Sequence, residues 1–377
     1  MRCLPCPTLR ARNRPLDIDS RPAVAEIVET HEQAAREEHP PLLVLEPLQA
    51  YLDAQGLGSG PIEHERIGEG HSNVTFLIRR GGERFVLRRP PRPPIPPSAH
   101  DVLREARLLS AVQDADVRTP PVLAACDDES VIGCPFYVME YIEGVVVTAQ
   151  MPPPLDSPVE RRRAGEELVD ALAEVHAVDW RACGLEGYGK PTGYLERQLR
   201  RFNGLWEHNK TRELPIIQEL SGWLAANMPE SPESTIVHGD YRLGNVMLAN
   251  EAPARLIAIF DWELSTIGDP LADLGYMTVT WAEDSDPEET SFSSLSAVTR
   301  QEGFPTREEL IARYEEKTGR AMGALNWYQA LALWKAAVFM EGNLKRFQAG
   351  ASDDEYLGLF VEGVPMLAEA ALQISRS

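Results

Sequence analysis

Lysine is scarce in this sequence of 377 residues, and none occurs before Lys190. The chain has only five lysines, so arginine supplies most of its 37 basic residues. The 58 acidic residues outnumber the basic ones and give a formal net charge of −21. Sequence-independent binding to a phosphate backbone depends on Lys and Arg side chains that displace counterions. The charge therefore argues against nucleic acid, and against an anionic membrane surface, as partners.

Cysteine and long apolar runs are also scarce. The five cysteines are odd in number and scattered, which favours a reducing cytoplasm over a disulfide framework. No apolar run reaches the length of about 18 residues that a membrane-spanning helix needs. These absences predict a cytoplasmic protein without a membrane span. With 43% hydrophobic residues, the chain can bury one large core or two smaller ones that share a cleft.

The chain divides into an extension and two expected lobes. Residues 1–44 mix prolines, arginines and acidic residues without a sustained apolar face, which predicts a loose N-terminal extension. Residues 45–143 are expected to form an N-lobe that binds nucleotide, and residues 144–377 a mainly helical C-lobe with the catalytic and substrate-binding groups. Strand-like runs occur in the N-lobe region at 63–67, 74–79, 84–88, 131–133 and 136–141. The predicted fold class is α+β, with a small antiparallel sheet and a larger helical part.

The motif HGDYRLGN at residues 238–245 is the strongest functional signal. Phosphoryl transfer needs a carboxylate that accepts the hydroxyl proton and, nearby, an amide oxygen that holds Mg²⁺. The spacing from Asp240 to Asn245 is that of the protein-kinase catalytic loop. A second apolar strand precedes Asp261, the next expected magnesium ligand. Aspartate also begins turns, but two aspartates and an asparagine in kinase order favour Asp240 as catalytic base and Asn245 and Asp261 as magnesium ligands.

A glycine-containing hairpin in the N-lobe region is the candidate phosphate-covering loop. Glycine permits close approach of the backbone to phosphate, although the same pattern fits an ordinary hairpin turn. The candidate nucleotide-binding residues of this hairpin are Gly68, Gly70, Ser72 and Asn73. Met139 and Tyr141, close to the expected junction of the lobes at residues 141–144, are further candidates.

Arg88 stands where protein kinases have a phosphate-binding lysine. A guanidinium can hold two phosphate oxygens and can also pair with the carboxylate of Glu105 on the following predicted helix. Because neighbouring strand residues point to opposite faces, Arg89 is expected to face solvent. The predicted helix occupies residues 102–112, and Ser98 or Asp101 can cap it.

These motifs resemble the aminoglycoside-phosphotransferase-like family, which includes the choline-kinase-like small-molecule kinases. The segment GDPLADL at residues 268–274 adds to the resemblance, which covers residues 45–350. It implies a two-lobed protein-kinase-like fold, ATP as co-substrate, Mg²⁺ as cofactor and a hydroxylated small molecule as phosphate acceptor. It also implies that Asp273 braces the catalytic loop and that His238 is a hydrogen-bonded scaffold.

A narrower resemblance concerns the acceptor. The segments LRRPP at 87–91, HSN at 71–73 and DWELSTIGDP at 261–270 resemble the kinase-like half of fused acyl-CoA dehydrogenases and its free-standing bacterial relatives. This implies a hydroxylated acyl chain, or its CoA thioester, as acceptor. Trp281, Trp327, Trp334 and Arg346 are candidate liners of the acceptor site, although helically spaced aromatic residues are more often core.

Alternatives remain open at this stage. Arginine in place of lysine at position 88 is compatible with a nucleotide other than ATP, or with a pseudokinase that binds nucleotide without turnover. An acidic chain could also attract a cationic aminoglycoside or choline-like acceptor. The oligomeric state also stays open, with a homodimer among the alternatives.

Overall fold

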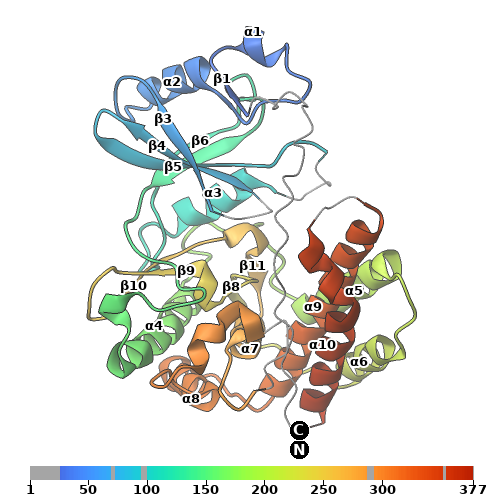
Figure 1. The fold of residues 1–377 in the computed structure, drawn as a ribbon. Coiled ribbons are helices and arrows are strands. Elements are labelled where there is room, and N and C mark those ends of the chain that lie inside the picture. Colours follow the sequence, from blue (N-terminus) through green and yellow to red (C-terminus); the bar gives the residue numbers. More distant parts are fainter. Residues whose placement is uncertain (1–25, 69–72, 95–99, 287–292, 351–353, 377) are drawn as a thin grey trace, which may run out of the picture.

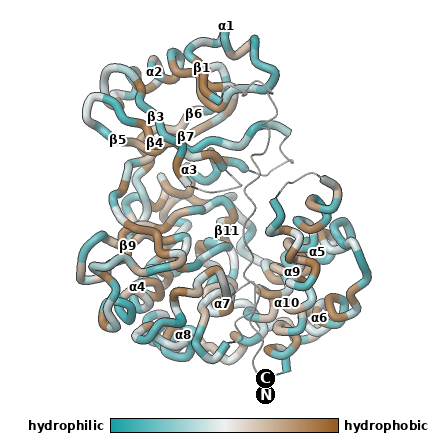
Figure 2. Tube along the Cα trace, viewed as in Figure 1, coloured by the Kyte–Doolittle hydropathy of each residue, from teal (hydrophilic) through white to brown (hydrophobic). Residues whose placement is uncertain are grey.

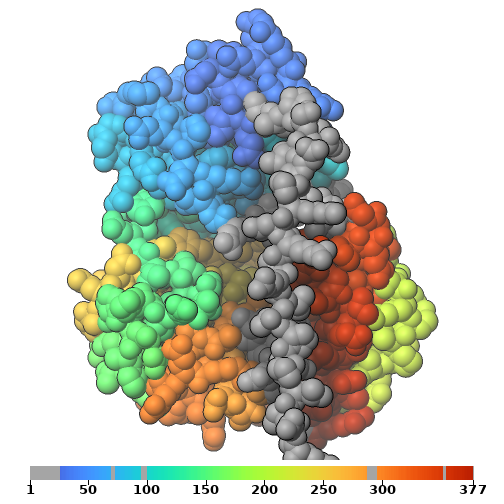
Figure 3. All heavy atoms as spheres, in the orientation of Figure 1, coloured from blue at the N-terminus to red at the C-terminus, as the bar shows by residue number. Residues whose placement is uncertain are grey.

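The structure, a computed structural model, describes residues 26–68, 73–94, 100–286, 293–350 and 354–376. It has a smaller lobe built on an antiparallel sheet and a larger, mainly helical lobe (Figure 1). Figure 3 shows the N-terminal lobe, in blue and cyan, above the C-terminal lobe, in green to red. This two-lobed α+β arrangement is the one that the sequence predicted.

A five-stranded sheet forms the centre of the N-lobe, in the order β3-β4-β5-β7-β6 with every neighbouring pair antiparallel. Its strands are β3 (Glu63–Ile67), β4 (Val74–Arg80), β5 (Glu83–Arg89), β6 (Val122–Cys126) and β7 (Phe136–Glu140). The strand predicted at residues 131–133 is wrong, because these residues form a turn and β6 takes that place. Val131 and Ile132 are apolar because the turn itself is buried.

Both faces of this sheet are covered. Phe85 and Leu87 of β5 pack beneath α2 (Leu45–Ala54), whereas Val86 faces α3 (Val102–Ala111) and the core of the large lobe. Asp101, one of the two predicted caps, forms the N-cap of α3. The alternation along β5 therefore divides the protein into a small outer core and a large inner one.

The segment just before residue 45 contributes to the outer core. β1 (Ile27–Val28) pairs in parallel with β2 (Leu43–Val44), with the short α1 (His31–Ala34) between them. Leu42 and Leu43 are fully buried against the sheet. The end of the expected loose extension, residues 41–44, is thus a packed cover over a face that would otherwise expose large apolar side chains, whereas most of residues 29–40 are exposed.

The larger lobe is built from seven helices among the described residues. They are α4 (Pro158–Ala177), α5 (Tyr194–Asn209), α6 (Pro215–Ala226), α7 (Leu271–Thr280), α8 (Arg307–Thr318), α9 (Leu325–Gln348) and α10 (Phe360–Ser375). Figure 1 shows α5, α9 and α10 side by side, with α7 between them and α4. Short 3₁₀ turns occur at Pro153–Leu155, Leu243–Asn245, Trp262–Leu264, Ser293–Arg300 and Glu355–Leu359.

Two antiparallel strand pairs carry the segments between α6 and α7. β8 (Thr235–Val237) pairs with β11 (Thr266–Gly268), and β9 (Val246–Leu248) pairs with β10 (Leu256–Ile259). These strands are mostly buried, and Figure 2 shows hydrophobic residues around β9 and in the N-lobe strands. The catalytic motifs of the sequence therefore follow rigid, buried strands.

The lobes are connected where β7 leads toward β9. Val145 forms a backbone bridge with Leu248. A β-carbon at Gly144 would come within 2.6 Å of the Leu248 carbonyl oxygen. Only glycine permits this approach without a shift of the backbone, so Gly144, at the end of the predicted junction at residues 141–144, lies directly against β9.

The last described segment is strongly apolar. The stretch Glu355–Ser375 has a mean hydropathy of 1.4 and is the one described helical stretch that could cross a membrane by length and composition. In the structure, Phe360, Val364, Leu367 and Ala371 of α10 are buried in the large core. The apolar face of α10 thus packs within the C-lobe.

Candidate active site between the lobes

The loop after β8 carries Asp240. It begins with Gly239, whose φ of 90° lies in the left-handed region, and a β-carbon there would approach the Leu264 carbonyl oxygen to 2.9 Å. Glycine is therefore needed for the chain to turn directly after the buried strand. The turn leaves Asp240 only partly buried, at the inner end of the loop.

Asn245 holds the carboxylate of Asp240. Its amide nitrogen donates to Asp240 Oδ2 at 2.8 Å and to the Asp240 carbonyl oxygen at 2.8 Å. Arg242 Nε lies 3.7 Å from the other carboxylate oxygen. Because both amide N–H groups of Asn245 face Asp240, its amide oxygen points away, and no described residue donates a hydrogen bond to that oxygen. The oxygen is available to a cation.

His238 connects the two catalytic segments. Its Nε2 lies 2.8 Å from the Phe260 carbonyl oxygen, which can only accept, so the ring proton is on Nε2. Nδ1 then accepts the backbone N–H of Asp240 at 3.2 Å. Both ring nitrogens are engaged with backbone groups, which is the arrangement of a scaffold histidine.

Asp273 braces the catalytic loop from α7. Its carboxylate accepts the backbone N–H groups of His238 at 2.6 Å and Gly239 at 2.8 Å, and His176 Nε2 lies at 3.2 Å. Burial opposes the charged form, but these partners hold the pKa of Asp273 below its ordinary value. Burial lowers the pKa of His176, whose Nδ1 accepts from the Tyr314 hydroxyl at 2.7 Å. The geometry agrees with the bracing role that the resemblance implied.

Asp261 follows β10 in a conformation uncommon for a residue with a side chain. Its φ of 65° and ψ of 54° lie in the left-handed region. Aspartate tolerates this conformation better than most residues, and non-glycine residues that adopt it are often found at functional sites. The preceding residue, Phe260, donates its backbone N–H to the Asn245 carbonyl oxygen at 2.9 Å. The two predicted magnesium ligands therefore lie on adjoining segments of the cleft.

The donor set fits magnesium that is shared with a nucleotide. Asp261 and Asn245 supply a carboxylate and an amide oxygen, whereas Mg²⁺ usually keeps water and substrate phosphates as its other ligands. Among the described residues, no group of three or more His, Cys, Asp and Glu side chains could hold a metal by itself. A binding site made of few protein oxygens requires the phosphates to complete it.

Arg88 links the lobes. Its Nε donates to Glu105 Oε2 at 2.9 Å, and its Nη2 donates to Asp261 Oδ1 at 2.7 Å. Burial lowers the pKa of Arg88, but the two carboxylates more than offset this and raise the pKa above its ordinary value. The predicted pair with Glu105 is therefore present, and Nη1 donates to no described residue.

The prediction that Arg89 faces solvent is wrong. Arg89 points to the opposite face of β5 from Arg88, but it is only 2% exposed. Its guanidinium donates to the carbonyl oxygens of Pro41, Leu42 and Pro90. Residues 41–44 cover the face of the sheet on which Arg89 lies, so that face is buried. Strand alternation alone could not indicate this cover.

Of the other predicted nucleotide-binding residues that the structure describes, Met139 is the one that lines the cleft beside Arg88. Met139, 7% exposed, lines a small cleft together with Arg88, Glu105 and Asp261, whereas Tyr141 beyond β7 contacts the Arg84 guanidinium at 4.4 Å. Gly68 directly follows β3 and has a φ of 80°. Asn73 is buried and donates to Glu263 Oε2 at 3.2 Å, but Gly70 and Ser72 lie outside the described residues.

Two tyrosines of the site were not found from the sequence. Burial and the Glu105 carboxylate raise the pKa of Tyr137, so its hydroxyl stays protonated and hydrogen-bonded to Glu105. Burial and Asp240 likewise raise the pKa of Tyr276 on α7, which hydrogen-bonds to Asp240. Neither belongs to a motif, and each reaches its carboxylate only through packing between distant segments. The motifs contained no signal for them.

The comparison with protein families gives one match. Residues 63–325 match the model of the phosphotransferase enzyme family APH. Acyl-CoA dehydrogenase family member 11 of Homo sapiens is 33% identical over 337 residues, and family member 10 of Mus musculus is 34% identical over 318 residues. These alignments cover 87% and 82% of this chain. The chain spans only 43% and 29% of the length of these relatives.

Solved structures of the same architecture exist. A proposed aminoglycoside phosphotransferase from Ralstonia eutropha is 31% identical, with a TM-score of 0.74 over 88% of this chain and 98% of that one. A choline kinase from Cryptosporidium parvum, 13% identical, has a TM-score of 0.57 over 84% of this chain and 89% of that one, which shows a shared fold alone. Both the sequence resemblance and the kinase-like fold class are confirmed.

Proposed function

Because this chain belongs to the phosphotransferase enzyme family, we propose that it transfers the γ-phosphoryl group of ATP to a hydroxyl of a small molecule. The proposed acceptor is a hydroxylated acyl chain, free or as its CoA thioester. The observation that carries the proposal is the Asp240 carboxylate, which Asn245 holds at 2.8 Å beside the segment of Asp261.

The chemistry assigns each group one role. Asp240 accepts the proton of the acceptor hydroxyl, whose oxygen forms a bond to the γ-phosphorus while the bond to the β,γ-bridging oxygen breaks and ADP leaves. Asn245 and Asp261 would hold Mg²⁺, which neutralises phosphate charge when it is bound. Arg88 Nη1 would donate to a phosphate oxygen while Glu105 keeps the guanidinium in place.

The acyl part of the proposal rests on the relatives. Acyl-CoA dehydrogenase family members 10 and 11 contain a region similar to this chain over 82–87% of its length. When a kinase-like region and an acyl-CoA dehydrogenase region occur in one chain, we expect both to act on the same class of compound. Since this chain covers less than half of those relatives, the acceptor is a proposal about the shared region alone.

Asp240→Asn tests the assignment of the base. The substitution keeps the shape and removes the proton acceptor, so turnover should fall by about 10²- to 10⁴-fold. ADP release would be measured with hydroxylated acyl compounds and their CoA thioesters. Affinity for a non-hydrolysable MgATP analogue, measured by calorimetry, should stay within about threefold.

The matched control is Asp114→Asn, the same chemical change at an exposed aspartate beyond α3. It should leave both turnover and affinity unchanged. If Asp240→Asn turns over a cognate acceptor within about threefold of wild type, Asp240 is not the base. If the wild type binds MgATP but phosphorylates no hydroxyl compound, the pseudokinase alternative, which Arg88 in place of lysine left open, takes its place.

A further inference from the structure

Lys335 of α9 lies in the C-lobe near the proposed base. Its Nζ is 4.9 Å from the centroid of the Phe202 ring on α5. Electrostatic interactions reach it from Asp240 in the catalytic loop and from Asp273 on α7, as well as from Arg201 on α5. Residues from three other segments, α5, α7 and the loop of Asp240, thus lie around one ammonium group.

This ammonium has no direct polar partner among the described residues. Lys317 pairs with Asp170 at 3.0 Å, and Lys210 pairs with Glu207 and Glu213, but Lys335 makes no hydrogen bond or ion pair. Burial lowers its pKa to about 8, although both nearby aspartates act in the opposite direction. Lys335 is half-buried, and even partial burial of a cation without a partner costs stability. An unpaired ammonium group that lowers stability beside a proposed catalytic base is more easily explained by a role in function than by a role in folding.

The wall next to Lys335 is apolar. Phe339 lies one helical turn further along α9, packs edge-on against Phe202 at 5.0 Å, and is 43% exposed. By contrast, Trp281, Trp327 and Trp334 are at most 2% exposed, so these candidate liners belong to the core. Arg201, which has no ion pair with a described residue, adds a second positive charge. A cation beside an apolar surface suits an acyl oxygen with its hydrocarbon chain and disfavours an ammonium compound.

We propose that Lys335 binds the acyl oxygens of the acceptor, either the carboxylate of a hydroxy acid or the carbonyl oxygen of its thioester, and thereby excludes cationic acceptors. The inference rests on the proposed function and names the residue that sets its specificity. Three N–H donors on a flexible stem can serve either oxygen type. Phe202 and Phe339 then contact the hydrocarbon chain.

The test compares matched ligands in the presence of saturating MgADP. Hydroxy acids of four to ten carbons, their CoA thioesters, the matched diols and the matched amino alcohols would be ranked by thermal shift, which reports binding to the native state. The acids or the thioesters should stabilise the wild type, and the amino alcohols should not. Lys335→Met should weaken the affinity for whichever ligand class stabilises the wild type by about tenfold or more, because the substitution removes a charge-assisted hydrogen bond.

Lys345→Met is the matched control. It removes the same charge from the same helix about 15 Å away, where Lys345 is exposed and contacts the His208 carbonyl oxygen. It should bind acids and thioesters as the wild type does. A response of the acids alone identifies the carboxylate as the ligand, whereas a response of the thioesters alone identifies the carbonyl.

A pH series gives an independent readout. Because Lys335 loses its proton as the pH rises through about 8, acid binding by the wild type should weaken above this pH. The Lys335→Met variant lacks this ammonium group, so its binding of the acids should not change over the same pH range.

Two results would overturn the inference. One is stabilisation of the wild type by the amino alcohols or diols equal to or greater than that by every acid and thioester. The other is unchanged binding by Lys335→Met. MgADP binding distinguishes a failure of the proposed function from a failure of the role of Lys335. If the wild type does not bind MgADP, the proposed function is contradicted. If it binds MgADP but shows no preference for acids or thioesters, only the role of Lys335 is contradicted.

Discussion

At the scale of single residues, two neighbouring arginines of β5 have opposite tasks. Arg88 faces the cleft and bridges Glu105 and Asp261. Arg89 faces the outer core and binds three backbone carbonyl groups there. One side chain is therefore available to a ligand, while the other holds the chain segment that covers the sheet.

Alanine substitutions should separate these tasks. Arg88→Ala should weaken MgATP binding by about 10- to 100-fold, because it removes a charge-assisted hydrogen bond. Arg89→Ala should leave MgATP affinity within about threefold, but should lower the free energy of unfolding by about 1–3 kcal/mol, because it leaves buried carbonyl groups without donors. Calorimetry and urea denaturation measure the two quantities. A loss of affinity in Arg89→Ala alone would mean that the register of β5 is displaced by one residue.

Residue spacing predicted one of these roles and missed the other. The alternation of a strand places Arg88 and Arg89 on opposite faces, and the position of Arg88 in the kinase pattern predicted its pair with Glu105. What covers each face depends on residues 41–44, more than 40 positions earlier. No local pattern contains that information.

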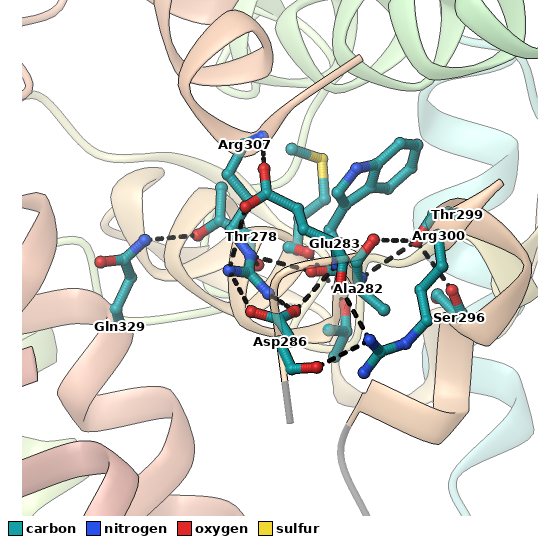
Figure 4. Close-up of polar contacts among 12 residues, drawn as sticks. Thr278, Ala282, Glu283, Asp286, Ser296, Thr299, Arg300, Arg307 and Gln329 are labelled. Atoms are coloured by element: carbon teal, nitrogen blue, oxygen red, sulfur yellow. Dashed lines mark hydrogen bonds and ion pairs between the residues drawn. The ribbon is translucent and has the colours of Figure 1, made fainter. Parts of the chain in front are cut away.

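At the scale of elements, α7 connects the catalytic loop to the rest of the C-lobe. Asp273, near its N-terminus, braces the loop. At its other end, Arg307 Nε donates to the carbonyl oxygens of Thr278 at 3.1 Å and Trp281 at 2.8 Å (Figure 4). Arg307 also pairs with Glu283 and Asp286, so one guanidinium satisfies the helix end and joins it to α8.

Arg307→Ala should therefore destabilise the protein by about 1–3 kcal/mol, because partly buried carbonyl and carboxylate groups lose their donor. Thermal or urea unfolding measures the loss. Affinity for MgATP at 25 °C should stay unchanged, since Arg307 is remote from the cleft. Arg376→Ala is the control, because its pair with Glu219 is largely exposed and should contribute at most about 1 kcal/mol. Equal effects of both variants would contradict the assigned role of Arg307.

Elements with strong local signals were predicted better than weak ones. The catalytic segments were found because buried strands, glycine and aspartate occur together within a few residues. β6 was missed because its short side chains, VLAAC, give little strand signal. The buried turn at residues 131–133 was mistaken for a strand because burial, and not strand pairing, accounts for its apolar residues.

At the scale of the whole molecule, Asp240 is the one residue of the proposed acceptor site that belongs to a sequence motif. Phe202 and Lys335 come together through the packing of α5 against α9, and Asp240 interacts with Lys335 from the loop after β8. The nucleotide side, in contrast, is composed of short motifs within single segments. This difference explains why the sequence identified a phosphotransferase more readily than its acceptor.

The net charge of −21 leads to a prediction for the molecule as a whole. MgATP is itself an anion, so long-range repulsion should slow its association at low ionic strength. Since salt shortens the Debye length from about 30 Å at 0.01 M to about 8 Å at 0.15 M, the association rate constant should rise with salt. Stopped-flow measurements with a fluorescent ATP analogue would test this, and neutral adenosine, whose association should not respond, is the control. If the rate constant for ATP instead falls steeply with salt, Arg88 and the other cations of the cleft dominate the field that an approaching nucleotide meets.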